Sequence, residues 1–159
     1  MSKVYFKRKE FVCHHCGKDG FEGYWVVLFL NGLRNMVGRP VIITSGYRCE
    51  EHNKAIGGSK NSMHVRGLAV DFYIKGMDWN VQKAIVLNAW IKFIVDYGIT
   101  LRLGIYEDKK FFHIDEKPVE MLSNDSLLWV KDRNGYHYGN FDRERFEEGI
   151  DAIKGGLRE

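Results

Sequence analysis

The chain has 159 residues, of which 45% are apolar and 28% are charged, and this composition is typical of one globular domain. Its two prolines exclude long proline-rich linkers, and a net charge of +3 with one short basic run, residues 7–9, does not indicate a nucleic-acid-binding face. No segment approaches the ~18 to 20 apolar residues of a membrane span, and none has the pattern of a secretory signal, so we expect synthesis in the cytoplasm without a signal peptide.

Residues 24–37 predict the first helix, after an extended, irregular segment over residues 1–20. Gly38 stands where the end of a helix favours a left-handed residue, and Pro40 prevents continuation. Apolar side chains recur at helical spacing along this segment: Trp25, Leu28, Phe29, Leu33 and Met36.

The β-branched run at residues 41–45 predicts a buried strand, and a polar, glycine-rich loop follows it. We expect a short helix within that loop, around residues 49–56, because the loop is long for a plain connection. Residues 68–74 predict the next strand. Residues 79–97 predict a long helix that ends at Gly98, with an apolar face formed by Val81, Ile85, Leu87, Ala89, Trp90, Phe93 and Ile94.

Two short segments, residues 100–106 and 110–115, predict a β-hairpin around the polar turn at 107–109. The pattern then weakens, although residues 127–130 predict a further strand and residues 141–157 a final amphipathic helix. This order of elements predicts an α+β fold with a small antiparallel sheet and flanking helices.

Two histidines and an aspartate form a candidate metal site. His64 ends the polar loop, and Asp71 lies seven positions later inside a predicted strand. Gly67 permits a tight bend between them, so both side chains can point to one place. His113, on a separate predicted strand, supplies a third ligand. A catalytic zinc site has three protein ligands and an open position for water, and an aspartate in a strand is costly to bury unless it is paired or bound to metal.

Residues 62–71 carry the pattern S-x-H-x-x-G-x-A-x-D, which resembles the signature of the zinc D-alanyl-D-alanine carboxypeptidases. That group includes phage L-alanyl-D-glutamate endopeptidases and shares its fold with the hedgehog signalling domain. The resemblance covers roughly residues 8–117. It also includes Thr44, Ser45, Gly46, Tyr47, Arg48, Asn53, Gly57, Gly58 and Asn61, and downstream the segments 104–106 and 112–115.

This resemblance implies roles for the matching positions. The three candidate ligands would bind zinc (Zn2+). Arg48 would contact substrate, since a guanidinium suits a terminal carboxylate or a carbonyl that gains negative charge in the transition state. Ser62 would lie near the substrate or shape its loop, and Tyr106 would line a groove or pack in the core. Asp115, two positions past His113, would support that ligand or serve the fold.

The sequence departs from the family pattern at the expected general base. Many relatives place a glutamate three positions before the last histidine ligand, and here that position holds Lys110. Two carboxylates in the neighbouring turn, Glu107 and Asp108, are the candidate bases, and we favour Asp108. The alternative is that both are solvated turn residues.

The three cysteines form a second candidate metal site, since so low and odd a count does not describe a disulfide framework. Cys13 and Cys16 form a C-x-x-C pair, which is half of a structural zinc site, and Cys49 offers a third ligand. A fourth ligand would come from a histidine: His14, His15 or His52. The alternative is that the thiols are reduced and packed beside the loop of Cys49.

We therefore expect a zinc peptidase domain over residues 1–118 and a C-terminal extension over residues 119–159 packed on the same domain. The expected substrate is the peptide stem of peptidoglycan, cut as a D-Ala-D-Ala carboxypeptidase or an L-Ala-D-Glu endopeptidase. We therefore expect a monomeric phage or prophage endolysin that acts after its release or as part of a virion. The alternative, suggested by Lys110, is a catalytically weak or inactive zinc-containing module that binds cell wall or builds a virion.

Overall fold

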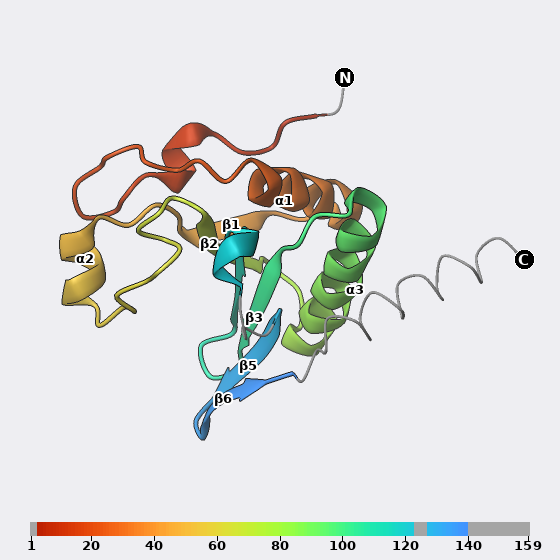
Figure 1. Cartoon of the computed structure of the whole chain (residues 1–159). Helices are drawn as coiled ribbons and strands as arrows, with labels where there is room; N and C mark the ends of the chain where they lie inside the picture. The colour runs from red at the N-terminus through yellow and green to blue at the C-terminus, as the bar shows by residue number, and fades with distance from the viewer. Residues whose placement is uncertain (1–2, 123–126, 140–159) are drawn as a thin grey trace, which may run out of the picture.

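The computed structural model describes residues 3–122 and 127–139 (Figure 1). Its elements in chain order are η1 Arg8–Phe11, α1 Tyr24–Val37, β1 Val41–Ser45, α2 Glu50–Ala55, β2 Ala69–Ile74, α3 Trp79–Tyr97, β3 Arg102–Tyr106, β4 Phe111–Asp115, η2 Val119–Met121, β5 Leu128–Asp132 and β6 Gly135–Tyr138. The predicted α+β class is confirmed. Within the described ranges, no helix has both the length and the apolar character that a membrane crossing requires.

Six strands form one sheet in the order β1-β2-β4-β3-β5-β6. Four neighbouring pairs are antiparallel, including the predicted β3–β4 hairpin, but β3 and β5 are parallel, so the predicted antiparallel sheet is a mixed, mostly antiparallel one. The predicted strand at 127–130 is found as β5, which extends to Asp132, and β6 was not predicted. The helix predicted at 141–157 lies outside the described residues.

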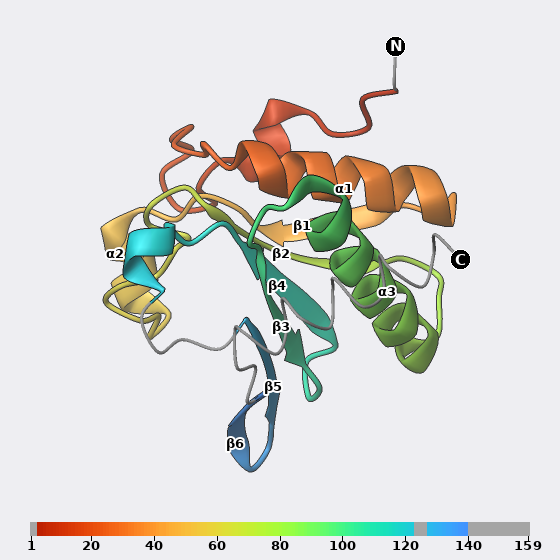
Figure 2. The same ribbon diagram turned by 45° about the vertical axis from the view of Figure 1, so that its right-hand side comes forward.

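Helices α1 and α3 cover one face of the sheet (Figure 2). Phe29 of α1 packs edge-to-face on Phe72 of β2 with ring centroids 6.4 Å apart, and Trp79 of α3 packs on Phe112 of β4 at 4.7 Å. Because successive side chains of a strand point to opposite faces, the neighbours of these phenylalanines, Asp71 and His113, project from the other face. The sheet therefore separates the apolar core from the candidate metal ligands.

The two long helices begin and end at recognisable residues. Both C-termini are capped by glycines in the left-handed region, Gly38 (φ 63°) and Gly98 (φ 64°), as predicted. Asp78 caps the start of α3 by accepting a hydrogen bond from the backbone N–H of Asn80. The predicted apolar faces need correction, because Met36 of α1 and Val81 of α3 are exposed. The buried stripe of α1 consists of Val26, Phe29, Leu30 and Leu33.

Candidate metal centre

His64, Asp71 and His113 each bring one ligand atom to a common point. The distance is 3.1 Å between His64 Nε2 and Asp71 Oδ1, 3.2 Å between His64 Nε2 and His113 Nδ1, and 2.9 Å between His113 Nδ1 and Asp71 Oδ1. A tetrahedral zinc ion with bonds of about 2.0–2.1 Å separates neighbouring ligand atoms by roughly 3.3 Å. The spacing of the three atoms is therefore close to that of a zinc ligand set.

Backbone geometry brings these three residues together. Asp71 and His113 are direct partners in the antiparallel β2–β4 pair. His64 reaches the same place through a turn at Gly67 (φ 72°), whose N–H donates to the His64 carbonyl at 3.1 Å. A Cβ atom at position 67 would lie 2.0 Å from the backbone oxygen of Gly20. A glycine is thus required at position 67, as the sequence predicted, both for its positive φ and for its close contact with Gly20.

Hydrogen bonds fix which ring nitrogen of each histidine carries the proton. His64 Nδ1 lies 2.8 Å from the carbonyl oxygen of Gly46, and His113 Nε2 lies 2.8 Å from Asp115 Oδ2. Since both of these oxygens can only accept, the two nitrogens donate, so that in the neutral imidazoles His64 Nε2 and His113 Nδ1 carry free lone pairs. These lone pairs and the Asp71 carboxylate face one another and need a cation between them. The site therefore fits a divalent metal.

Asp115 contacts the ring nitrogen of His113 that faces away from the ligand cluster, and Arg102 holds Asp115 in place. Arg102 donates to both carboxylate oxygens of fully buried Asp115, from Nε at 2.8 Å and from Nη2 at 2.6 Å. Burial alone would raise the pKa of Asp115, but the hydrogen bonds from His113 and Arg102 outweigh it and lower this pKa to about 2. Burial alone would lower the pKa of His113, but the bonds to Asp115 and Asp71 raise it to about 9. The buried carboxylates thus favour positive charge at the centre.

Asp71 is also held in its ionised form. Burial would raise the pKa of this carboxyl, but the positive charge and the hydrogen bonds that His64 and His113 offer when both of their ring nitrogens are protonated lower it well below its usual range. An ionised aspartate next to two imidazoles is a suitable mixed ligand set for zinc.

Trp129 forms part of the same site, which the sequence did not indicate. Its ring lies 5.4 Å from the ring of His113, and the guanidinium of Arg102 stands over it at 5.2 Å. Gly104, the cross-strand partner of His113, makes room for the indole, because a Cβ at that position would lie 2.5 Å from Trp129. No local pattern predicts this contact, since it depends on the parallel pairing of β3 with β5.

Arg48 is buried beside the metal ligands. Its Nη1 donates to Asn53 Oδ1 at 2.9 Å, and its Nη2 lies 3.3 Å from Ser45 Oγ and 3.9 Å from Asp71 Oδ2. The buried Nε atom has no hydrogen-bond partner among the described residues. A buried guanidinium with an unused donor next to the candidate ligands suits the predicted contact with substrate.

The other two predicted substrate contacts have different surroundings. Ser62 Oγ accepts a hydrogen bond from the backbone N–H of His64 at 3.2 Å, so Ser62 shapes the loop that presents this ligand. Tyr106 lies on the same sheet face as His113 and stacks on Phe111 with centroids 4.4 Å apart. Its hydroxyl lies 3.4 Å from the indole nitrogen of Trp129, and burial raises its pKa. Tyr106 therefore belongs to the wall of the site.

The structure does not bring the two candidate bases into the ligand cluster. Glu107 accepts hydrogen bonds from Lys83 Nζ at 2.8 Å and from Trp79 Nε1 at 2.9 Å, and both donors belong to α3, which covers the opposite face of the sheet. Burial alone would raise the pKa of Glu107, but these bonds lower it. Asp108 is exposed in the turn and makes no hydrogen bond or ion pair with a described residue. Of the two, only Asp108 has a side chain free to reorient.

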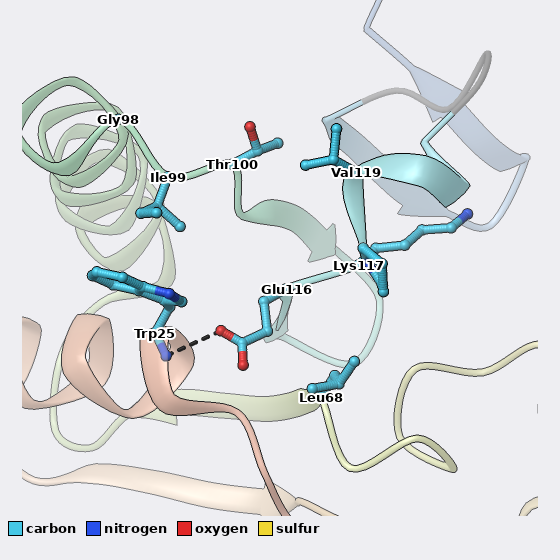
Figure 3. Close-up of a pocket in the computed structure, with 9 residues that line it drawn as sticks. Trp25, Leu68, Gly98, Ile99, Thr100, Glu116, Lys117 and Val119 are labelled. Carbon is cyan, nitrogen blue, oxygen red and sulfur yellow. Dashed lines mark hydrogen bonds between the residues drawn. The ribbon is translucent and has the colours of Figure 1, made fainter.

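A surface pocket of about 450 Å³ lies at another position and contains none of the candidate ligands (Figure 3). It is lined by Trp25, Leu68, Gly98, Ile99, Thr100, Glu116, Lys117, Pro118 and Val119. The carboxylate of Glu116 already accepts a hydrogen bond from the backbone N–H of Trp25 at 3.0 Å, at the start of α1. This residue therefore caps a helix.

Cys13, Cys16 and Cys49 form a second cluster, with sulfur atoms within 4.8 Å of one another. All three thiols are free, and Cys13 is buried whereas Cys16 is exposed. Burial alone would raise the pKa of Cys13, but hydrogen bonds from the backbone of Cys49 and Cys16 and from the side chain of His52 lower it to about 5. The predicted second candidate site is therefore brought together in space.

Comparison with known families agrees with this geometry. The sequence profile of a family described as Peptidase M15 matches residues 4–115, which is more than half of the chain and includes all three candidate ligands of the first cluster. No curated protein matches the chain.

Proposed function

Because the chain belongs to the peptidase M15 family, the family of the zinc D-alanyl-D-alanine carboxypeptidases, we propose that it is a zinc-dependent peptidase acting on the peptide stem of peptidoglycan. One observation carries the proposal: His64 Nε2, Asp71 Oδ1 and His113 Nδ1 converge while the other nitrogen of each imidazole is already engaged. Within residues 3–122 and 127–139 the set has no fourth protein ligand, as expected of a catalytic site that leaves a position for water.

The surrounding residues support hydrolysis of an acyl bond. A zinc ion held by these three side chains would polarise the scissile carbonyl and activate water. Arg48 binds the substrate carboxylate, or the carbonyl oxygen as its charge develops, through a guanidinium that Asn53 orients. Asp108 is our candidate for the group that accepts a proton from water, which requires the turn at 107–110 to fold toward the ligands.

The finer assignment rests on the resemblance of residues 62–71 to the family signature. It favours a D-Ala-D-Ala carboxypeptidase or an L-Ala-D-Glu endopeptidase, in the role of a phage or prophage endolysin, and a fold shared with the hedgehog signalling domain. Either bond lies next to a D-configured residue and a carboxylate, for which a buried arginine is a suitable receptor.

Digestion of purified peptidoglycan, followed by mass analysis of the fragments, tests the proposal and identifies the cleaved bond. Fragments with new amino and carboxyl ends at a stem peptide bond are expected, and they should disappear with a chelator and return with added zinc. Digestion that continues undiminished with the chelator would refute a zinc peptidase.

One observation favours a second candidate function, a zinc-containing module that binds cell wall without cutting it. Lys110 occupies the position of the usual base, and Glu107 is bonded to α3. Sedimentation of the protein with intact peptidoglycan, together with an absence of released fragments in the presence of zinc, would favour this candidate over the first.

A further inference from the structure

Four metal-binding side chains, outside the site of the proposed function, lie where the N-terminal segment meets α2. Besides the three clustered thiols, His52 directs Nδ1 toward the buried sulfur of Cys13 at 3.7 Å. The four residues form two short pairs in the sequence, Cys13-x-x-Cys16 and Cys49-x-x-His52. Such pairs, each spanning one tight turn, are the usual way in which a chain supplies four ligands to a structural zinc ion.

Local backbone geometry presents the first pair. The N–H of Gly17 donates to the carbonyl of Cys13 at 2.8 Å, and the N–H of Cys13 donates to the carbonyl of Lys18 at 2.9 Å. Gly17 has a φ of 70°, which lets the chain reverse directly after Cys16. The reversal places both thiols on the same side of a compact turn.

The second pair begins α2 and is bonded to the first. The N–H of Cys49 donates to Cys13 Sγ at 3.3 Å, and the N–H of His52 donates to Cys49 Sγ at 3.4 Å. These two contacts hold the sulfur atoms of Cys13 and Cys49 at the place where the two pairs meet.

We propose that Cys13, Cys16, Cys49 and His52 bind a structural zinc ion in a closed tetrahedral site. Zinc bonds of about 2.3 Å to sulfur and 2.0–2.1 Å to nitrogen separate a sulfur and a nitrogen ligand by roughly 3.6 Å, close to the observed 3.7 Å. With four protein ligands, the site has no open position, so its role is to stabilise structure.

The site would fasten the N-terminal segment to the part of the chain that carries Arg48. Cys49 directly follows Arg48 and caps α2, and Asn53 in the same helix holds the guanidinium. Phe11 accepts a further backbone bond from Tyr47 at 2.8 Å, on the other side of Arg48. A metal bound here would therefore fix the position of Arg48 relative to the catalytic ligands.

His14 and His15 are the competing fourth ligands, and His15 supplies the control. Its side chain is exposed, it lies 3.7 Å from Glu51, and its ring centroid is 5.8 Å from that of His52. Nδ1 of His52 faces Cys13. Substitution of His52 should therefore abolish zinc binding at this site, whereas substitution of His15 should not.

Metal analysis of the full chain, purified with zinc and a reductant, tests the proposal without using peptidase activity. We expect two zinc ions per chain in the wild type, one in Cys16→Ser and in His52→Ala, and two in His15→Ala. His64→Ala should retain the ion at the cysteine site, so failure of the proposed function and failure of this inference are distinguishable. Two ions in His52→Ala, or loss of an ion in His15→Ala, would overturn the assignment of His52.

Cobalt substitution of the wild type keeps the test decisive if a variant does not fold. Cobalt bound to thiolates should give a sulfur-to-metal charge-transfer absorption, and the metal should protect the thiols from a thiol reagent until a chelator is added. A protein that carries one metal ion per chain, lacks that absorption and has freely reactive thiols would refute the site. So would a disulfide between any two of the cysteines in the protein as purified.

Discussion

Asp71 and His113 are cross-strand partners on β2 and β4, and Asp71 Oδ1 lies 2.9 Å from His113 Nδ1. The sheet itself therefore sets the distance between two of the three candidate ligands. His64 is held differently, by a turn at Gly67 and a hydrogen bond from its ring to Gly46. A preformed ligand set of this kind binds metal in the folded state and not in the unfolded chain, which links metal binding to stability.

Removal of metal should lower the melting temperature. With free zinc at 100 times its Kd, one site contributes about 2.7 kcal/mol, which corresponds to roughly 5–10 °C for a chain of this size. Differential scanning calorimetry with and without a chelator measures the change. The decrease should become smaller in His64→Ala, and an unchanged melting temperature in the wild type would contradict metal binding at either site.

Asp115→Asn should weaken zinc binding about 10- to 100-fold, as is usual when a carboxylate behind a ligating histidine is lost. The substitution removes the negative charge that orients His113 and that accepts two hydrogen bonds from Arg102. Competition with a chelating dye gives the affinity. Asp96→Asn is the matched control, because Asp96 pairs with Lys92 on the exposed surface of α3. Equal affinities in the two variants would exclude this role for Asp115.

Arg48→Lys should reduce kcat/KM on peptidoglycan fragments about 100-fold while zinc content stays at the wild-type level. A lysine keeps the charge but cannot contact Asn53 and the substrate at the same time, as we propose for the guanidinium. Steady-state kinetics and metal analysis together measure this. Arg39→Lys, at an exposed arginine that bonds to the carbonyl of Gly76, should leave kcat/KM unchanged.

The two turn carboxylates should respond differently to loss of charge. Asp108→Asn should lower kcat by about 10²- to 10⁴-fold, as expected for loss of a general base. Glu107→Gln should leave kcat nearly unchanged and lower stability, because Glu107 is bonded to Lys83 and Trp79 on α3. Measurement of kcat and of urea unfolding for both variants separates the two effects. Wild-type kcat in Asp108→Asn would remove it from the mechanism.

Glu116→Ala should destabilise the protein by about 1 kcal/mol, the usual cost of losing a helix cap. Gly23 provides no side chain at the start of α1, and the carboxylate of Glu116 accepts the Trp25 N–H instead. Glu120→Ala removes an equal charge from an exposed position and should have little effect. Urea unfolding of both variants gives the difference, and equal free energies of unfolding would show that Glu116 does not cap α1.

The local parts of the site could be predicted from the sequence. The spacing of His64, Gly67 and Asp71 encodes a turn followed by a strand, and the turn requires a glycine. The helix ends at Gly38 and Gly98 were predictable for the same reason, since φ above zero favours glycine.

The remaining features depend on pairing between distant segments. The side of the sheet on which Glu107 lies changes with a shift of one residue in a strand, so the sequence left both turn carboxylates as candidates. The contact between Trp129 and His113 requires a parallel strand pair whose partners are far apart in the chain. The exposed position of Met36 reflects where α1 meets the sheet, and helical spacing alone does not determine this.

The parallel pairing of β5 with β3 also determines how far the chain can be shortened. The family match stops at residue 115, yet the hydrogen-bonding edge of β3 is occupied by residues 128–131. A recombinant fragment ending at residue 118 would leave that edge open to strands of other molecules and would strip the indole from beside His113. A fragment limited to the family match would therefore aggregate more readily and would lack one wall of the candidate site. Screening for inhibitors or crystals should begin with the longer polypeptide.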